Sequence, residues 1–204
     1  MIPAGIQRAI GEYAELEMEI DRLVKQRLYG VCAACEKPCC RADVGQEAVS
    51  SWWLRQVSRH VHGKWWPDDW ETRQQCVALT EAGCKLTAGR PAICRSFVCE
   101  KYTEAYGDLW EAIFFSFVAD LLGEVTRVSS RVDLAGLDAD DVPRYAKAIA
   151  ERIAAARRQL DLAKGLLEAD VEPLQKHRIA LKLLCSVPRF LRATTRRAIL
   201  ARLE

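Results

Sequence analysis

The sequence predicts a mostly α-helical protein in which a small, irregular, cysteine-rich metal-binding lobe is inserted between the helices of a helical bundle. Two observations support this fold class. Apolar residues recur at helical spacing on both sides of residues 31–102. Eight of the nine cysteines lie inside that segment, where Gly and Pro residues interrupt any regular pattern. Half of the residues are hydrophobic, so the chain can form a packed core.

Residues 1–30 are expected to form an N-terminal helix that packs on the bundle. Gly30 is a suitable residue to end this helix, because glycine is common directly after a helical C-terminus. The apolar residues that recur at helical spacing are Ile6, Ile10, Tyr13, Ile20, Val24 and Leu28.

Residues 31–102 are expected to form the metal-binding lobe. The pattern predicts a loop over 31–44, a helix over 46–62, and short strands around 77–79 and 85–87. The apolar face of the predicted helix consists of Trp52, Trp53, Val57 and Val61, and an irregular turn around Pro67 follows. The five tryptophans of this segment form either a dry shell over a metal or a small core, and the core is favoured because large aromatic side chains usually anchor one.

Residues 103–204 are expected to form a helical scaffold that ends in basic helices. A strongly apolar helix is predicted over 103–129, and a long helix follows with Asp138 or Asp140 as its N-cap and Pro143 in its first turn. Two shorter helices are predicted over 173–185 and 188–203. The long helix has apolar residues at steps of three and four, typical of a helix that packs along another: Val142, Tyr145, Ile149, Ile153, Ala156, Leu160, Ala163 and Leu167.

The sequence shows neither the pattern expected of a membrane span nor that of a secretory signal. No stretch of about 18 apolar residues free of charge is present, so no membrane span is expected. The first residues lack the basic start and apolar run of a secretory signal, which favours a cytoplasmic location. In that reducing compartment, dense cysteines favour metal binding over disulfides.

The cysteines form two clusters that are predicted to ligate metal. The first cluster is Cys32, Cys35, Cys39 and Cys40, and the second is Cys76, Cys84, Cys94 and Cys99. A Cys-x-x-Cys spacing brings two thiolates to one metal, as in zinc and iron–sulfur sites. Eight thiolates suffice for two tetrahedral zinc sites, or for one [4Fe-4S] cluster and four further thiols. The adjacent pair Cys39–Cys40 favours two sites or a separate task for one thiol, because neighbouring side chains diverge.

Basic residues alternate with these cysteines. Arg90 and Arg95 are the candidate cofactor-binding residues, since a zinc ion with four thiolates keeps a net charge of −2 that donors to sulfur would balance. The other interpretation is a solvated basic surface. His60 and His62 are weaker candidate ligands, and the isolated Cys185 is expected to be a small buried apolar residue.

These motifs resemble the YkgJ-type cysteine-cluster family, which is described as zinc- or iron-chelating. The family pattern ends in Arg-Pro-x-x-Cys-Arg-x-Phe-x-Cys, which this chain matches from Arg90 to Cys99. The family begins with Cys-x-x-Cys-x-x-Cys-Cys, whereas here one extra residue separates Cys35 from Cys39. The resemblance covers about residues 31–102 and implies a metal-chelating module without implying a reaction.

The C-terminal region is strongly basic although the whole chain has a net charge of only +2. Between Pro173 and Glu204 there are eight Lys or Arg residues and one acid, which gives +7 for this piece. Such helices suit an acidic protein partner; nucleic acid is less favoured, and an anionic membrane surface is a further alternative. The favoured interpretation is an internal role, in which the basic tail neutralises acidic helices such as the first.

Three functions follow from these patterns. The first is a zinc- or iron-chelating protein that holds metal for structure, storage or delivery. The second is an iron–sulfur enzyme of redox or group-transfer chemistry, although no Gly-rich loop for a nucleotide-like cofactor follows a predicted strand. The third is an adaptor whose lobe is folded by metal and whose helices bind a macromolecule. No set of Ser, His and Asp residues suggests a hydrolase.

Overall fold

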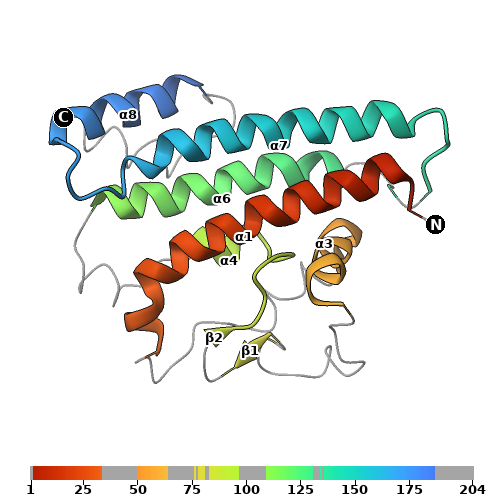
Figure 1. Ribbon diagram of the computed structural model, residues 1–204, viewed down its shortest axis with the longest axis horizontal. Helices are drawn as coiled ribbons and strands as arrows, with labels where there is room; N and C mark the ends of the chain where they lie inside the picture. The colour runs from red at the N-terminus through yellow and green to blue at the C-terminus, as the bar shows by residue number, and fades with distance from the viewer. Residues whose placement is uncertain are drawn as a thin grey trace.

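The computed structural model describes residues 2–33, 50–63, 76, 78–80, 83–96, 109–130, 134 and 136–186. These parts are mostly helical, as the sequence predicts (Figure 1). Their elements, in chain order, are α1 (Ala4–Ala33), α3 (Trp52–His62), β1 (Leu79–Thr80), β2 (Gly83–Cys84), α4 (Ile93–Ser96), α6 (Leu109–Ser130), α7 (Val142–Lys164) and α8 (Pro173–Ser186).

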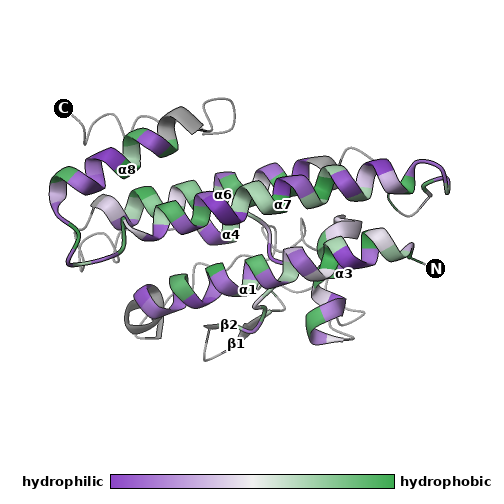
Figure 2. Cartoon of the chain, turned by 45° about the horizontal axis from the view of Figure 1, so that its top comes forward, coloured by the Kyte–Doolittle hydropathy of each residue, from purple (hydrophilic) through white to green (hydrophobic). Residues whose placement is uncertain are grey.

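The long helices α1, α6 and α7 lie side by side and form the body of the molecule (Figure 1). The helix α8 packs on α7, while α3 packs on α1 and α6, and α4 packs on α6. Hydrophobic and hydrophilic residues alternate along these helices, as expected when each helix buries one face (Figure 2). No helix within the described ranges is long and apolar enough to cross a membrane.

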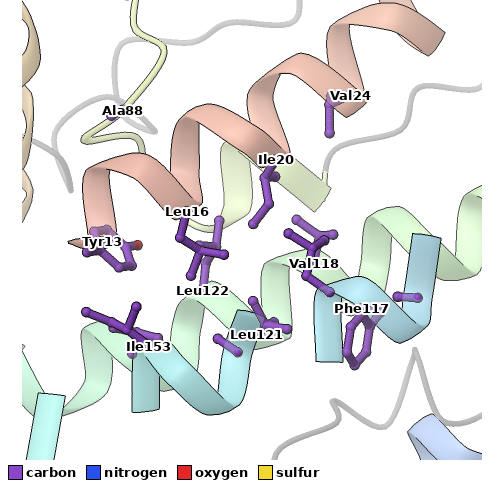
Figure 3. Close-up of a cluster of buried hydrophobic side chains, with 14 of the residues drawn as sticks. Tyr13, Leu16, Ile20, Val24, Ala88, Phe117, Val118, Leu121, Leu122 and Ile153 are labelled. Atoms are coloured by element: carbon purple, nitrogen blue, oxygen red, sulfur yellow. The ribbon is translucent and has the colours of Figure 1, made fainter. Parts of the chain in front are cut away.

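The core lies where α1, α6 and α7 meet. Leu16 and Ile20 of α1 project toward Val118 and Leu122 of α6, and Ile153 of α7 closes the cluster (Figure 3). Each of these side chains is at most 1% exposed. The apolar stripes of the sequence are therefore the surfaces by which these helices pack.

The helix α7 confirms the predicted seam and corrects its predicted cap. Its buried residues all come from the predicted stripe: Ile149, Ile153, Ala156, Leu160 and Ala163. The cap residue is Asp141, not Asp138 or Asp140, and its side chain makes no capping hydrogen bond. The carbonyl of Asp138 accepts from the N–H groups of Asp141 and Val142. Backbone hydrogen bonds, rather than a side-chain cap, therefore form the turn that leads into the helix. Pro143 lies in the first turn, as predicted.

The helix α1 is longer than the sequence predicts, because it continues past Gly30 to Ala33. A glycine ends a helix when it adopts a positive φ, and Gly30 instead keeps the helical conformation. Contacts to other elements hold the end of α1: Arg27 donates to Glu111 Oε1 (3.1 Å) and to the carbonyl of Leu167 (2.8 Å). As a result, the backbone of Cys32 belongs to the last turn of α1 rather than to a loop.

The helix α3 spans Trp52–His62 and confirms the predicted helix over these residues, while residues 46–49 of that prediction lie outside the described structure. Its start is set by Ser51, whose hydroxyl accepts from the Leu54 N–H (3.3 Å). The apolar face is confirmed in part: Trp53 and Val57 are buried with Leu54, while Trp52 and Val61 are half-buried. The predicted loop 31–44, the turn around Pro67 and the helix 188–203 lie outside the described residues, apart from 31–33 in α1.

The two short strands form an antiparallel pair, with Leu79 opposite Cys84 and Thr80 opposite Gly83. The sequence places the second strand slightly too late, at 85–87. The pairing does extend to Lys85, whose N–H donates to the carbonyl of Ala78 (2.8 Å), and the chain then leaves the hairpin to pack against α1 and α3.

Candidate metal centre

Residues 83–96, which contain two predicted ligands, form a segment that is docked on α1 and α3; we call it the docked segment. Cys84 lies in β2 and Cys94 in α4, and both are half-buried, as is Cys76. Cys76 and Cys84 are free thiols rather than halves of a disulfide. The side chain of Cys32 and the whole of Cys35, Cys39, Cys40 and Cys99 lie outside the described structure, as do the side chain of Cys185 and three of the five tryptophans.

The docked segment is anchored by a buried cluster of four charged side chains. Two carboxylates come from α1, where Glu17 and Asp21 lie one helical turn apart on the face that packs against the segment. Two guanidinium groups, those of Arg90 and Arg95, come from the segment itself. We call these four residues the charge clamp. The side chains of Glu17 and Arg95 are fully buried and that of Asp21 is 4% exposed, so their pairing takes place away from solvent.

Asp21 is the centre of the charge clamp. Its Oδ1 accepts from Nη1 of Arg90 (3.1 Å) and from Nη1 of Arg95. Its Oδ2 pairs with Nζ of Lys25 on the next turn of α1 (2.9 Å). Three cationic groups thus surround one carboxylate, and this arrangement compensates the cost of burying it.

Glu17 is the less well-compensated carboxylate. Its Oε2 accepts from the Gly89 N–H, while its Oε1 lies 3.9 Å from Nη2 of Arg95 and accepts no hydrogen bond from the described residues. Burial raises the pKa of Glu17 to about 7, although Arg95, Arg90 and the Gly89 N–H act in the opposite direction. The side chain therefore changes its charge near neutral pH.

Arg90 links the charge clamp to the cysteines. Its Nη2 donates to the carbonyl of Cys94 (3.0 Å), and its side chain is 13% exposed. Burial alone would lower the pKa of Arg90, but the sulfurs of Cys84 and Cys94, followed by the carboxylates of Asp21 and Glu17, raise it above its usual value. The guanidinium group thus interacts electrostatically with two thiol sulfurs and two carboxylates.

Arg95 has a different role, because its described contacts go to oxygen atoms. It pairs with Asp21 and Glu17, and its Nη2 donates to the carbonyl of Thr87 (2.7 Å). Burial and the charge of Arg90 lower its pKa, while both carboxylates raise it; the guanidinium group remains charged at any physiological pH. Of the two predicted cofactor-binding residues, Arg90 is the one whose pKa the described sulfurs raise, and its role toward a cofactor stays a prediction.

Gly89 lets the docked segment approach α3 closely. It has a positive φ of 76°, and a Cβ atom there would lie 2.5 Å from Cβ of Ser58 and 2.7 Å from the carbonyl oxygen of Leu54. No side chain fits at that distance. In the Gly-Arg-Pro sequence, Gly89 therefore packs against α3, and the next residue, Arg90, pairs with α1.

The two candidate histidine ligands point to different elements. Nε2 of His62 accepts from the Thr87 N–H (3.3 Å), so that nitrogen is already engaged in holding the docked segment to α3. Burial lowers the pKa of His62, against the effect of Asp21, which favours the neutral ring that this contact requires. His60 is exposed and lies next to Gly11 of α1.

The donor set near Arg90 suits a thiophilic metal. Thiolate sulfur is the preferred ligand of structural zinc and of iron–sulfur clusters, and a neighbouring cation compensates thiolate charge. Among the described residues, no three His, Cys, Asp or Glu side chains gather at metal-binding distance. The described part of the chain therefore contains three of the predicted cysteine ligands, Cys76, Cys84 and Cys94, and a counter-charge for two of them, while the other predicted cysteine ligands fall outside it.

A cavity of about 350 Å³ lies between α6 and α7, distant in sequence from every predicted ligand. Two of its charged lining residues pair with each other, since Glu124 contacts Nη1 of Arg152 (3.2 Å), and Glu124 also contacts Nη2 of Arg127 (2.6 Å). The lining residues are Phe117, Asp120, Leu121, Glu124, Ala148, Glu151, Arg152, Ala155, Ala156 and Gln159. None of the residues predicted for metal or cofactor binding lines it.

Glu17 and Asp21 are the site residues that the sequence analysis missed. The signal was present, because Glu17 falls between Tyr13 and Ile20 at the three-and-four spacing of the apolar stripe. A carboxylate in such a stripe is buried, and a buried carboxylate needs a cationic partner from elsewhere in the chain.

Fold and site together define a class: a helical protein to which a cysteine-bearing segment is anchored by buried charges. No protein-family model, curated protein or solved structure matches this chain.

Proposed function

We propose that this protein chelates zinc or iron through its clustered cysteine thiolates, as the resemblance to the YkgJ-type family implies. The observation that carries the proposal is that Arg90 pairs with the buried Asp21 of α1 and donates to the carbonyl of Cys94, while the sulfurs of Cys84 and Cys94 raise its pKa. A guanidinium group beside two thiols compensates the negative charge that these sulfurs acquire when they bind a metal.

Two further features support a chelating site. The docked segment is fixed by the charge clamp and by His62, so Cys84 and Cys94 are held by a rigid element rather than by a free loop. The helix α1, which supplies both clamp carboxylates, also carries the backbone of Cys32 in its last turn. In Figure 1 the end of α1 and the β1–β2 hairpin lie on the same side of the long helices. The helix α1 thus carries both the backbone of Cys32, from the first cysteine cluster, and the carboxylates that hold the docked segment with Cys84 and Cys94, from the second cluster.

The test is a metal analysis of protein purified both with and without oxygen. The proposal predicts at least one equivalent of zinc plus iron per chain, and an absorbance band at about 400 nm if iron–sulfur is bound. The double variant Cys84→Ser, Cys94→Ser should lose metal, whereas the control variant Cys185→Ala, outside both clusters, should keep it. Less than one equivalent in both wild-type preparations would refute the proposal, and an iron–sulfur band would favour the enzyme alternative.

An adaptor function has its own supporting observation on α8. Leu174 and Leu181 lie two turns apart and are 65% and 46% exposed, and the exposed Arg178 lies between them. The acidic residues Glu15 and Glu19 of α1 pair with Arg157 and Lys164 of α7, so these two carboxylates have cationic partners on a helix other than α8. Deleting residues 173–204 should then abolish capture of an acidic protein partner while metal content persists.

A further inference from the structure

One carboxylate holds both arginines of the docked segment. Oδ1 of Asp21 accepts from Arg90 (3.1 Å) and from Arg95, and the Asp21 side chain is 4% exposed. Few other contacts with described residues fix the Arg90 guanidinium: Nη2 donates to the Cys94 carbonyl (3.0 Å), and Nε has no hydrogen-bond partner in the described structure. The position of Arg90 therefore depends on Asp21.

The docked segment itself depends less on Asp21. Gly89 donates to Glu17, Thr87 donates to His62, and Arg95 also contacts Glu17. These contacts hold the segment on α1 and α3 without the Asp21 carboxylate. Loss of that carboxylate would thus release Arg90 from its position while the backbone that carries Cys84 and Cys94 stays docked.

We propose that Asp21 is a positioning residue for the thiolate site: it acts through Arg90, whose guanidinium group it directs to the sulfurs of Cys84 and Cys94. The inference rests on the proposed chelating function. A metal bound by several thiolates carries excess negative charge, and a fixed cation stabilises it more than a mobile one, because a fixed cation need not be ordered when the metal binds. Losing a residue that orients such a partner typically weakens metal binding by about 10- to 100-fold.

The experiment measures Zn²⁺ and Co²⁺ affinity of the full-length chain, by competition with a chromophoric chelator under reducing, oxygen-free conditions. Asp21→Asn should weaken both affinities by about 10- to 100-fold, and Arg90→Gln should do the same. The matched control is Glu15→Gln, which removes an exposed carboxylate of the same helix that pairs with Arg157, and its affinities should stay within about twofold of wild type.

Two readouts separate positioning through Arg90 from a general structural effect. The double variant Asp21→Asn, Arg90→Gln should bind no more weakly than Arg90→Gln alone, because the two residues act in series. The sulfur-to-Co²⁺ charge-transfer band should move to lower energy in both single variants, since sulfur without its neighbouring cation is more easily oxidised. Arg90→Lys, which keeps the charge, should retain more of the wild-type band position than Arg90→Gln.

The inference would be overturned if the fold-losses of metal affinity in the two single variants multiplied in the double variant, or if Asp21→Asn kept wild-type affinity. Either result would leave the proposed function intact. If Asp21→Asn does not fold by circular dichroism, Asp21→Glu replaces it: this variant keeps the charge but displaces it by one methylene. Wild-type affinity and band position in Asp21→Glu would then overturn the inference. If the wild-type chain itself binds neither metal, the proposed function fails first, and the inference fails with it.

Discussion

Within the helical body, α6 and α7 pack against α1, and the docked segment also packs against α1, but different interactions hold these two regions together. The body is held by apolar side chains, such as Leu16 and Ile20 of α1 against Leu122 of α6 (Figure 3). The docked segment is held by the charge clamp and by the close contact of Gly89 with α3. The hydrophobic effect scales with the apolar area removed from water and is not directional, whereas a buried ion pair depends on geometry and on the charge of each partner.

This difference affects how each region responds to change. A buried ion pair contributes little net stability compared with apolar residues of the same volume, yet breaking it is costly because a charge is left unpaired. We therefore expect the body to determine how stable the fold is, and the charge clamp to determine where the cysteines lie. The following changes test that division, beginning with the largest expected effect.

Shortening an apolar side chain in the body should have the largest effect on stability. Leu122 is fully buried in the core, and Leu122→Ala should lower the free energy of unfolding by about 4 kcal/mol, the sum of lost burial and a new cavity. Urea denaturation of the metal-free protein measures this change. Leu174→Ala, at a residue 65% exposed on α8, serves as the control and should change stability by less than about 0.5 kcal/mol. Similar losses in both variants would contradict an apolar body.

The charge clamp should make stability depend on pH through Glu17. Its pKa is raised to about 7 from an ordinary 4.5, so the neutral acid predominates in the folded protein below about pH 7. The corresponding stabilisation is complete below pH 4.5 and is lost as the pH rises through about 7. The free energy of unfolding should fall across this window by up to about 3 kcal/mol on account of this group.

The comparison with Glu17→Gln isolates that contribution. Glutamine keeps the shape of the side chain and an oxygen that accepts from Gly89, but it does not ionise. The difference in free energy of unfolding between the two proteins should therefore shift in favour of the variant as the pH rises. Parallel pH profiles, measured by urea denaturation of metal-free protein, would show that Glu17 does not titrate in the folded state.

The body could be predicted from the sequence because its apolar residues keep a regular spacing. The seam of α7 appears in the structure at the predicted positions, from Ile149 to Ala163. The ends of helices were less predictable, because they depend on distant contacts. Gly30 does not end α1, since Arg27 is held by Glu111 of α6 and by the carbonyl of Leu167, and no local pattern reveals those partners.

The candidate site could be predicted only in its residue types. The spacing of Cys84, Arg90 and Cys94 indicated thiolates with nearby cations, and in the structure Arg90 donates to the Cys94 carbonyl while both sulfurs raise its pKa. The sequence did not indicate that Arg95 would contact oxygen atoms instead, because its partners Glu17 and Asp21 lie more than 70 residues earlier in the chain. Pairing between distant charges is decided by tertiary packing, which a local pattern does not contain.

The close contact of Gly89 can be tested against a glycine that lacks it. Gly89 and Gly63 both have positive φ values, 76° and 71°, but a Cβ atom at Gly63 would meet no atom within 4 Å. Gly63→Ala should therefore cost only backbone strain, about 1 kcal/mol. Gly89→Ala should cost about 2 kcal/mol more, because its methyl group displaces α3 at Ser58, and it should also weaken metal binding. Equal stability losses in the two variants would mean that the segment does not pack as closely on α3 as the structure shows.

The smallest expected effect concerns α3, the helix against which the docked segment rests. The Ser51 hydroxyl accepts from the Leu54 N–H (3.3 Å) and satisfies one of the free N–H groups of the first turn. Ser51→Ala should lower the free energy of unfolding by about 1 kcal/mol, while Ser51→Asp, which retains a capping oxygen, should lower it by less. Metal affinity should be the same in both variants, since the cap lies at the opposite end of α3 from His62. If Ser51→Ala instead weakened metal binding by the same free energy as it lowers stability, the helical body and the docked segment would unfold as one unit. The two regions would then differ only in the interactions that hold them, apolar packing in the body and ion pairs in the segment.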